Sequence, residues 1–236
     1  MLRIAGCPTT EAIGELVLEP GGSIAIIGPN GSGKTSLLRF VALGTAPYPI
    51  DMCKVYVGAK ILDSRDPSER ARLGIHYIPS ERLVFPELTV EENIKLGMVA
   101  GNIPRSERRK ILEEIYTLLP IMAQRRNQLA GTLSGGEQKI LSIARALSAR
   151  ARILLIDEPS AGLAPKAIDT IYDLFKKLRS RGVSIIIAEQ SVVPFVRNQD
   201  AVDTVYVAHN RRILAAYKPK DLLGVDVIRN YFGLKG

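Results

Sequence analysis

The chain has 236 residues, of which 46% are apolar and 24% are charged, and this composition predicts one compact soluble domain with a substantial core. The formal net charge of +8 is compatible with an anionic ligand. The basic clusters at 105–110 and 125–126 contain no interleaved aromatic residues, so we expect no nucleic-acid partner. The apolar runs are far shorter than the roughly 18 residues that span a bilayer, so we expect no transmembrane segment.

The two cysteines, Cys7 and Cys53, lack the spacing of metal ligands. No charged-then-apolar leader precedes them. We therefore expect a reduced, cytoplasmic protein in which both side chains are small inert hydrophobic groups.

The expected elements alternate between strands and helices. Continuous apolar strands between helices indicate a parallel sheet that is covered on both faces. A helical stretch runs from Thr89, an N-cap with Glu92 three residues later, to about Ala130. In chain order we expect short strands within residues 1–27, broken by Gly14 and by a turn at 20–22; strands at 54–57 and 75–78; the helical stretch; a helix from Ser134; a strand at 153–156; a helix at 164–181; and a strand at 183–188.

The glycine-rich segment 28–35 follows the apolar run 23–27 and opens a helix, which is the context of a phosphate-binding loop. Glycines let several backbone N–H groups point at a phosphate, the helix N-terminus adds partial positive charge, and Lys34 reaches the outer phosphates. Thr35 offers its hydroxyl to Mg²⁺. We therefore predict a nucleoside triphosphate site formed by Gly28, Pro29, Asn30, Gly31, Ser32, Gly33, Lys34, Thr35 and Ser36.

The apolar strand 153–156 ends in two carboxylates, Asp157 and Glu158, at the edge where open α/β sheets place their ligands. Adjacent carboxylates point in different directions. Asp157 therefore suits coordination of Mg²⁺, and Glu158 suits a catalytic base that orients the attacking water in line with the terminal phosphate.

A third motif, Leu133-Ser134-Gly135-Gly136-Glu137-Gln138, immediately precedes a helical run. Ser134 is placed to cap that helix, the glycines allow close approach of the backbone, and the helix dipole favours a negative group. The order of the three motifs and the residues within them resemble those of the ATP-binding cassette (ABC) ATPases, and the resemblance extends over about residues 20–223.

This resemblance implies a P-loop NTPase fold in a single domain, 1–236, with a mainly parallel sheet core, an antiparallel N-terminal β portion and a helical subdomain at about 89–130. It also implies ATP and Mg²⁺ as cofactors, in a head-to-tail dimer where ATP lies between the phosphate loop of one protomer and the signature residues of the other. The chain has one copy of each motif, so a second protomer must complete either site. The implied signature residues are Leu133, Ser134, Gly135, Gly136 and Glu137.

Within this family, residues 85–94, 157–165 and 188–191 resemble the second ATPase subunit of the branched-chain amino-acid importers. The resemblance implies a peripheral subunit on the cytoplasmic face of the membrane, paired with a second ATPase subunit, that drives transport by ATP-driven dimer closure. It further implies that the helical subdomain and the loop around 80–86 form a groove for a coupling helix of the transmembrane permease.

Three other functions are considered. An importer for urea or short amides has a closely similar second ATPase. A soluble ABC protein that acts on ribosomes or DNA is disfavoured, because such proteins usually carry two cassettes or a long inserted coiled coil. An inactive partner subunit is disfavoured by the intact Lys34, Asp157 and Glu158.

Several positions depart from the family pattern. Gln190 stands where most ABC ATPases have a histidine that contacts the terminal phosphate, and since an amide carries no proton we expect slower or asymmetric turnover. Ser80, followed by Glu81, stands where a glutamine or glutamate touches Mg²⁺ and the attacking water, and the sequence does not choose between the two. Ala164 replaces a usual aspartate. Residues 1–39 contain no aromatic residue to stack on adenine, so we expect weak base recognition and relaxed selectivity for ATP over GTP.

Overall fold

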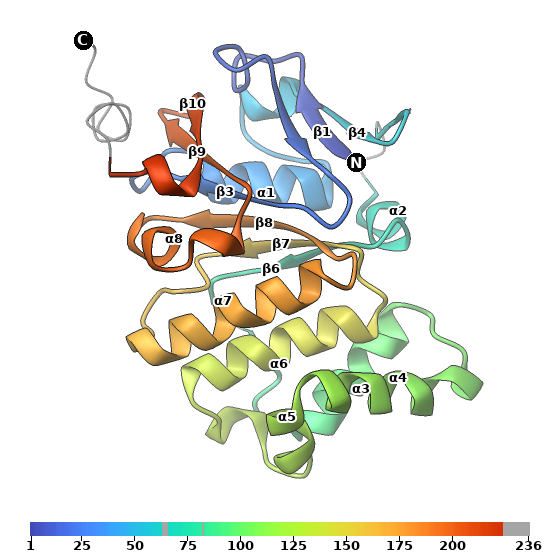
Figure 1. Cartoon of the computed structure of the whole chain (residues 1–236). Helices are drawn as coiled ribbons and strands as arrows, with labels where there is room; N and C mark the ends of the chain where they lie inside the picture. The colour runs from blue at the N-terminus through green and yellow to red at the C-terminus, as the bar shows by residue number, and fades with distance from the viewer. Residues whose placement is uncertain (63–65, 82, 224–236) are drawn as a thin grey trace.

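The computed structural model describes residues 1–62, 66–81 and 83–223 of the chain (Figure 1). The end of the predicted domain 1–236 and position 82 of the predicted groove loop lie outside the described residues.

Two sheets form the framework of the molecule (Figure 1). The larger sheet has the strand order β10-β9-β3-β8-β7-β6 and is parallel except for the β9–β10 pair, whereas the smaller sheet, β2-β1-β4-β5, is antiparallel. The predicted parallel core with an antiparallel N-terminal portion is therefore confirmed. The strands are β1 (Leu2–Ala5), β2 (Glu15–Leu18), β3 (Ser23–Ile27), β4 (Lys54–Val57), β5 (Lys60–Ile61), β6 (Ile75–Ile78), β7 (Ile153–Asp157), β8 (Ser184–Glu189), β9 (Thr204–His209) and β10 (Arg212–Tyr217).

The large sheet separates two apolar cores, because successive side chains of a strand point to opposite faces. On one face, Ile26 packs in a core with α1 (Lys34–Leu43) and the small sheet. On the other face, Ile27 packs in a core with α6 (Gly135–Ser148) and α7 (Pro165–Arg179). Helices α1 and α6 therefore lie on opposite faces of the sheet, as Figure 1 shows.

Three further helices, α3 (Val90–Ala100), α4 (Arg105–Leu118) and α5 (Pro120–Gln124), cover the side of α6 away from the sheet (Figure 1). Thr89 caps α3 in a reciprocal capping box with Glu92, as predicted. Gly97 lets α3 approach α6 closely, since a Cβ there would lie 2.1 Å from the carbonyl oxygen of Arg145. The shorter elements are α2 (Pro67–Arg72), α8 (Val193–Arg197), and the 3-10 turns η1 (Ile50–Met52), η2 (Ala130–Thr132), η3 (Gln199–Ala201) and η4 (Pro219–Asp221).

The helices of the described part of the chain include none that is both long and apolar enough to cross a membrane.

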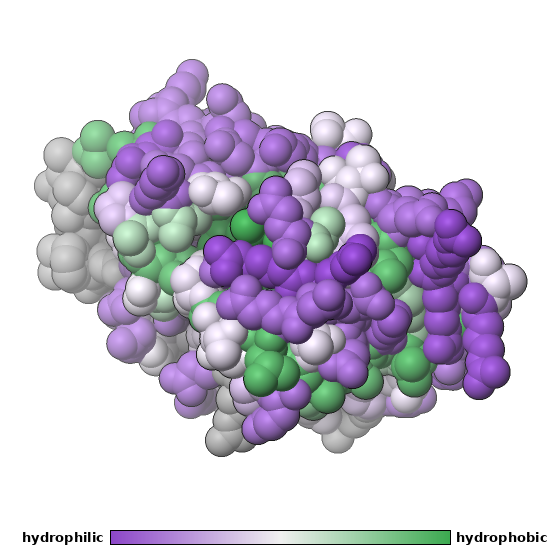
Figure 2. Space-filling view, turned by 90° about the horizontal axis from the view of Figure 1, so that it is seen from below, coloured by the Kyte–Doolittle hydropathy of each residue, from purple (hydrophilic) through white to green (hydrophobic). Residues whose placement is uncertain are grey.

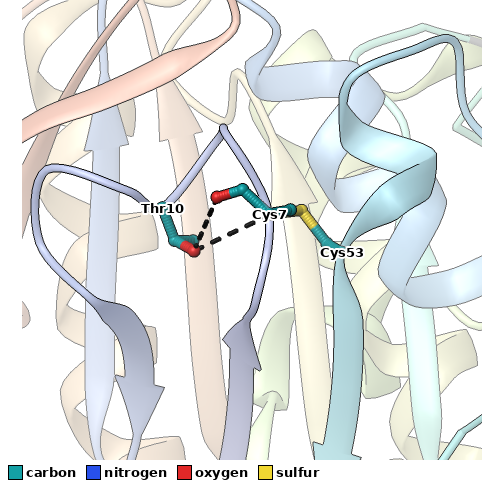
Figure 3. The surroundings of a disulfide bond; sticks show 3 residues. All are labelled: Cys7, Thr10 and Cys53. Carbon is teal, nitrogen blue, oxygen red and sulfur yellow. Dashed lines mark hydrogen bonds between the residues drawn. A yellow bond between two sulfur atoms is a disulfide. The ribbon is translucent and has the colours of Figure 1, made fainter.

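The prediction of two inert, reduced cysteines is wrong. Cys7 and Cys53 form a disulfide bond, which joins the loop after β1 to the start of β4 (Figure 3). The physical reason is the antiparallel pairing of β1 with β4, which sets Ala5 opposite Lys54 and so brings the two cysteines together. Their separation of 46 residues hides this proximity from any local sequence pattern.

Candidate functional site

Three parallel strands end side by side and assemble the candidate site. Ile27 at the end of β3 pairs with Glu189 at the end of β8, and Asp157 at the end of β7 pairs with Ala188. The glycine-rich loop after β3, Glu158 after β7 and the residue after β8 consequently emerge at one edge of the sheet, which is where α/β sheets place ligands.

The loop 28–35 has the backbone of a phosphate-binding loop. Gly31 and Gly33 have φ of +78° and +95°, a region that glycine occupies without steric cost. A Cβ at Gly28 would lie 2.1 Å from the carbonyl oxygen of Ala208, so only glycine allows the loop to pass this close to β9. Gly33 is the N-cap of α1, whose first backbone N–H groups therefore remain available to an anion.

Lys34 is buried inside this loop, with 4% of its surface exposed. Its ammonium donates hydrogen bonds to the carbonyl oxygens of Gly28 (2.8 Å) and Pro29 (3.0 Å) and to the hydroxyl of Ser32 (3.3 Å). Burial lowers the pKa of Lys34, and the nearby carboxylates of Glu158 and Asp157 oppose that shift. The loop therefore holds a cation where phosphate oxygens can replace neutral carbonyls as its partners.

Asp157 is 2% exposed and has a partner at each carboxylate oxygen. Its Oδ1 accepts a hydrogen bond from the Thr35 hydroxyl at 3.1 Å, and its Oδ2 accepts one from the Tyr77 hydroxyl of β6 at 2.9 Å. Burial and the Asp157 charge both raise the pKa of Tyr77, so the phenol remains a hydrogen-bond donor at neutral pH. Tyr77 thus fixes the carboxylate in an orientation that leaves Oδ1 directed at Thr35.

Glu158 occupies a left-handed backbone conformation, with φ of +46°, which is uncommon for a non-glycine residue and costs free energy. Its N–H donates to the carbonyl oxygen of Ala188, and its own carbonyl oxygen accepts from the ammonium of Lys139 at 2.9 Å. Lys139, on α6, also reaches the carbonyl oxygen of Ser80 at 3.5 Å. One buried lysine therefore ties the Glu158 turn to the loop after β6.

Glu189 is buried at the end of β8, with 2% of its surface exposed. Its Oε1 accepts hydrogen bonds from the Ser160 backbone N–H at 2.8 Å and from the Tyr172 hydroxyl at 3.4 Å. Burial raises the pKa of Glu189, and the bonds from Ser160 oppose that shift. The side chain fastens the end of β8 to the segment that follows Glu158.

The predicted signature residues lie away from the phosphate loop within one chain. Ser134 caps α6 through a capping box with Glu137, whose carboxylate accepts from the Ser134 backbone N–H at 2.9 Å. Gly135 lies against Leu163 in the loop before α7, and Gly136 lies against Ala167 of α7. Because α6 and α1 lie on opposite faces of the sheet, this chain's own Ser134 does not join its own phosphate loop.

The remaining predicted residues reach the site edge. Gln190 is exposed and directly follows β8, and Ser80 is joined to the Glu158 turn through Lys139. Thr35 is brought to Asp157, and Glu158 lies next to it in the turn after β7.

The sequence does not single out three polar residues of the site: the half-buried Tyr77 and the buried Lys139 and Glu189. Their only local signal was a polar group within an otherwise apolar strand or helix face, as with Lys139 beside the buried Ile140 and Leu141. Buried charged groups are rarely found without partners, so a polar residue in an apolar segment indicates a candidate site residue, as a glycine-rich motif does.

The comparisons with known proteins agree with this geometry. The family model described as ABC transporter matches residues 14–161. The chain is 34% identical over 197 residues to the high-affinity branched-chain amino acid transport ATP-binding protein BraG of Pseudomonas aeruginosa, covering 84% of this chain and 81% of that protein. It is 37% identical over 169 residues to a probable branched-chain amino acid transport ATP-binding protein, LivF, of Archaeoglobus fulgidus, covering 71% and 70%.

This chain is also similar to proteins that are named for the transport of other substances. The lipopolysaccharide export system ATP-binding protein LptB of Haemophilus influenzae is 28% identical over 210 residues, covering 89% of this chain and 84% of that one. Among solved structures, an ATP-binding cassette of an ABC transporter in its ADP conformation superposes with a TM-score of 0.81 at 26% identity, covering 99% of this chain and 98% of the other.

Proposed function

Since this chain belongs to the ABC transporter family and is an ATP-binding ATPase of that family, we propose that it powers an importer of branched-chain amino acids from the cytoplasmic face of the membrane. The observation that supports its catalytic part is the assembly of Lys34, Asp157 and Glu158 at one edge of the sheet. The proposed substrate class, branched-chain amino acids, is supported by the relatives that are named for the transport of these amino acids.

In this proposal the loop 28–36 binds the phosphates of ATP. Backbone N–H groups at the start of α1 and the Lys34 ammonium supply the positive charge. Mg²⁺ fits Thr35 and Asp157, because both offer hard oxygen ligands and already lie 3.1 Å apart. Within the described residues there is no cluster of three or more His, Cys, Asp or Glu that could hold a metal. When bound, Mg²⁺ neutralises charge on the phosphates.

Glu158 is proposed as the general base that orients and deprotonates the attacking water. Its strained backbone is held on both sides, by Ala188 and by Lys139, so the carboxylate is presented without reorganisation during the reaction. Gln190 is proposed to donate an amide hydrogen bond to the terminal phosphate, and Ser80 or Glu81 to contact the Mg²⁺ shell or the water.

The proposed site is completed by a second protomer. The helix that follows the phosphate loop, α1, and the helix that follows the signature segment, α6, lie on opposite faces of one sheet. A head-to-tail pair is therefore proposed to bring Leu133, Ser134, Gly135, Gly136 and Glu137 of one chain to the loop of the other. The capping box engages the backbone N–H groups of Ser134 and Glu137 and defines where α6 begins. The N-terminal end of the helix dipole is proposed to face the nucleotide of the other chain. Resemblance to the second of two importer ATPases favours a different ATPase subunit as partner, and in its absence two copies of this chain are proposed to pair when ATP bridges them.

The permease is proposed to dock between the three outer helices and the large sheet. A pocket of about 480 Å³ is lined there by residues of β6, α3 and α6, with exposed Phe85 and Val99 at its edge. Figure 2 shows the face of the molecule that carries these outer helices, where apolar patches lie among hydrophilic side chains. This apolar pocket lies beside the loop 80–86, which follows β6. It suits a helix of the permease whose position would change with the nucleotide bound at the site.

The proposal is tested with the chain assembled with its permease and second ATPase in liposomes that enclose a substrate-binding protein. We expect leucine to stimulate ATP hydrolysis several-fold and urea or ribose to have no effect. A complex that carries Glu158→Gln serves as the blank. Stimulation by urea instead would reject the branched-chain assignment in favour of the short-amide importer.

A further inference from the structure

The disulfide bond joins two irregular segments of the chain. Cys7 lies in the loop 6–14 between β1 and β2, called here the Cys7 loop, and Cys53 ends the stretch 44–53 between α1 and β4, called here the Cys53 segment (Figure 3). Among the described residues no hydrogen bond or ion pair runs between the two, so apart from apolar packing the disulfide is the bond that joins them. It therefore limits how far the Cys7 loop and the Cys53 segment move apart.

Both segments line a small cavity beside the phosphate loop. The Cys7 loop contributes Thr9 and the Cys53 segment contributes Ile50, and both side chains are buried. The phosphate loop contributes Ser32, Gly33 and Lys34 to the same cavity. Protein interiors are close-packed, so a shift of Thr9 or Ile50 is transmitted to these loop residues.

The turn between β9 and β10 connects the phosphate loop to both segments. The Arg211 backbone N–H donates a hydrogen bond to the carbonyl oxygen of Ser32 at 3.0 Å, and its guanidinium donates to the carbonyl oxygen of Tyr48 in the Cys53 segment at 2.7 Å. The Ile213 backbone N–H donates to the carbonyl oxygen of Thr9 in the Cys7 loop at 2.8 Å. The turn, the Cys53 segment and the Cys7 loop thus form a ring that the disulfide closes, and the phosphate loop is attached to this ring at Arg211.

A surface pocket adjoins the disulfide. Cys53 lines a pocket of about 210 Å³ at the end of α1. Thr45, Asp51 and Lys54 line the same pocket and are exposed, so the pocket opens at the surface and is large enough for a small thiol. Disulfides in reducing compartments are mostly transient or redox-sensing, and the location proposed for this chain, the cytoplasmic face of the membrane, is such a compartment.

We propose that Cys7 and Cys53 form a redox-modification site, at which a dithiol reductant opens the disulfide and so lowers the affinity of the phosphate loop for nucleotide. This inference rests on the proposed function of the loop 28–36. A thiolate of the reductant attacks the Sγ of Cys53 and displaces the Cys7 thiolate, and the second thiol of the reductant then displaces Cys53 from the mixed disulfide. The protein gains two electrons and two protons and ends with two thiols, while the reductant ends as a disulfide. Exchange with an oxidised dithiol reverses the step.

The oxidised chain is the form in which the phosphate loop is held ready for its ligand. When the disulfide opens, the Cys7 loop and the Cys53 segment gain freedom, and a nucleotide must order them again as it binds. Part of the binding free energy is then lost. Because such coupling is reciprocal, a bound nucleotide makes the disulfide harder to reduce by the same factor.

The test measures nucleotide affinity in both redox states of the full chain. Equilibrium dialysis with labelled ADP and Mg²⁺ is carried out with and without dithiothreitol, at a temperature where circular dichroism shows both forms folded, and thiol titration confirms each state. We expect the reduced chain to bind ADP about fivefold more weakly than the oxidised chain. In buffers of reduced and oxidised dithiothreitol, saturating ADP should shift the equilibrium towards the protein disulfide by the same factor.

Three variants separate redox control from general loss of stability. Cys7→Ala with Cys53→Ala should bind ADP as the reduced chain does, whether or not dithiothreitol is present. Arg211→Ala removes another link of the ring, so dithiothreitol should change its ADP affinity much less. Ile115→Ala truncates a buried side chain of α4 in the core on the other face of the sheet, and it should lower stability without changing ADP affinity.

Equal ADP affinities of the oxidised and reduced chains would overturn the inference, and the disulfide would then be a structural bond only. It is also overturned if Ile115→Ala weakens ADP binding as much as reduction does, because the loss would then reflect stability alone. If neither redox form binds ADP, the proposed function of the loop 28–36 fails together with the inference. ADP binding that does not depend on the redox state rejects the inference alone.

Discussion

Glu158→Gln is expected to lower steady-state ATP hydrolysis about a hundredfold or more, because a positioned general base contributes roughly 10² to 10⁴ to the rate. The amide has the same shape, and the two backbone hydrogen bonds that hold the residue, to Ala188 and from Lys139, do not involve the side chain. The variant should therefore fold as before and bind ATP with nearly unchanged affinity. Phosphate release measures the first effect, and calorimetric titration with ATP measures the second.

The matched control is Glu113→Gln, which removes a carboxylate from the exposed surface of α4, where it pairs with Arg109. This control should hydrolyse ATP at the unmodified rate. If Glu158→Gln retained full hydrolysis, the base would have to be another group, and the role proposed for the strained turn after β7 would be rejected.

Loss of the disulfide is expected to have the largest effect on stability. Closing a loop across a separation of 46 residues stabilises the folded state by about 4 kcal/mol when the gain is attributed to the entropy of the unfolded chain. The variant Cys7→Ala with Cys53→Ala should therefore unfold at a clearly lower urea concentration than the oxidised chain. The two positions are buried, so alanine introduces no polar group.

Reductant provides the internal control for this prediction. It should shift the unfolding midpoint of the unmodified chain towards that of the variant and leave the variant unchanged. Equal midpoints for the oxidised chain and the variant, with thiol titration confirming the redox state, would contradict a stabilising role for the bond.

The elements and motifs that the sequence predicted are those set by neighbouring residues. The run 23–27 with the glycine-rich loop after it predicts a strand, a phosphate loop and a helix, and the structure has β3 and α1 there. The apolar strand that ends in Asp157 is likewise found as β7. Both are signalled by the composition and spacing of neighbouring residues, which is what local sequence patterns describe.

Features that depend on register and distant pairing could not be predicted in this way. Tyr77 reaches Asp157 only because β6 pairs with β7, which places residues 80 apart in the chain within 2.9 Å. The contact of Lys139 with Glu158 and the disulfide also could not be predicted, because each joins segments that only the fold brings together.

This chain is an ATPase of the ABC family, and we propose that its catalytic site needs a second protomer. The most direct test is steady-state ATP hydrolysis by the purified chain over a wide range of protein concentration, with Glu158→Gln as the blank. We expect the specific activity to rise with protein concentration, as dimers form, and to vanish in the variant. A measurable specific activity that is equal at every concentration would contradict the need for a second protomer, and activity that survives Glu158→Gln would contradict the role of Glu158 as the base.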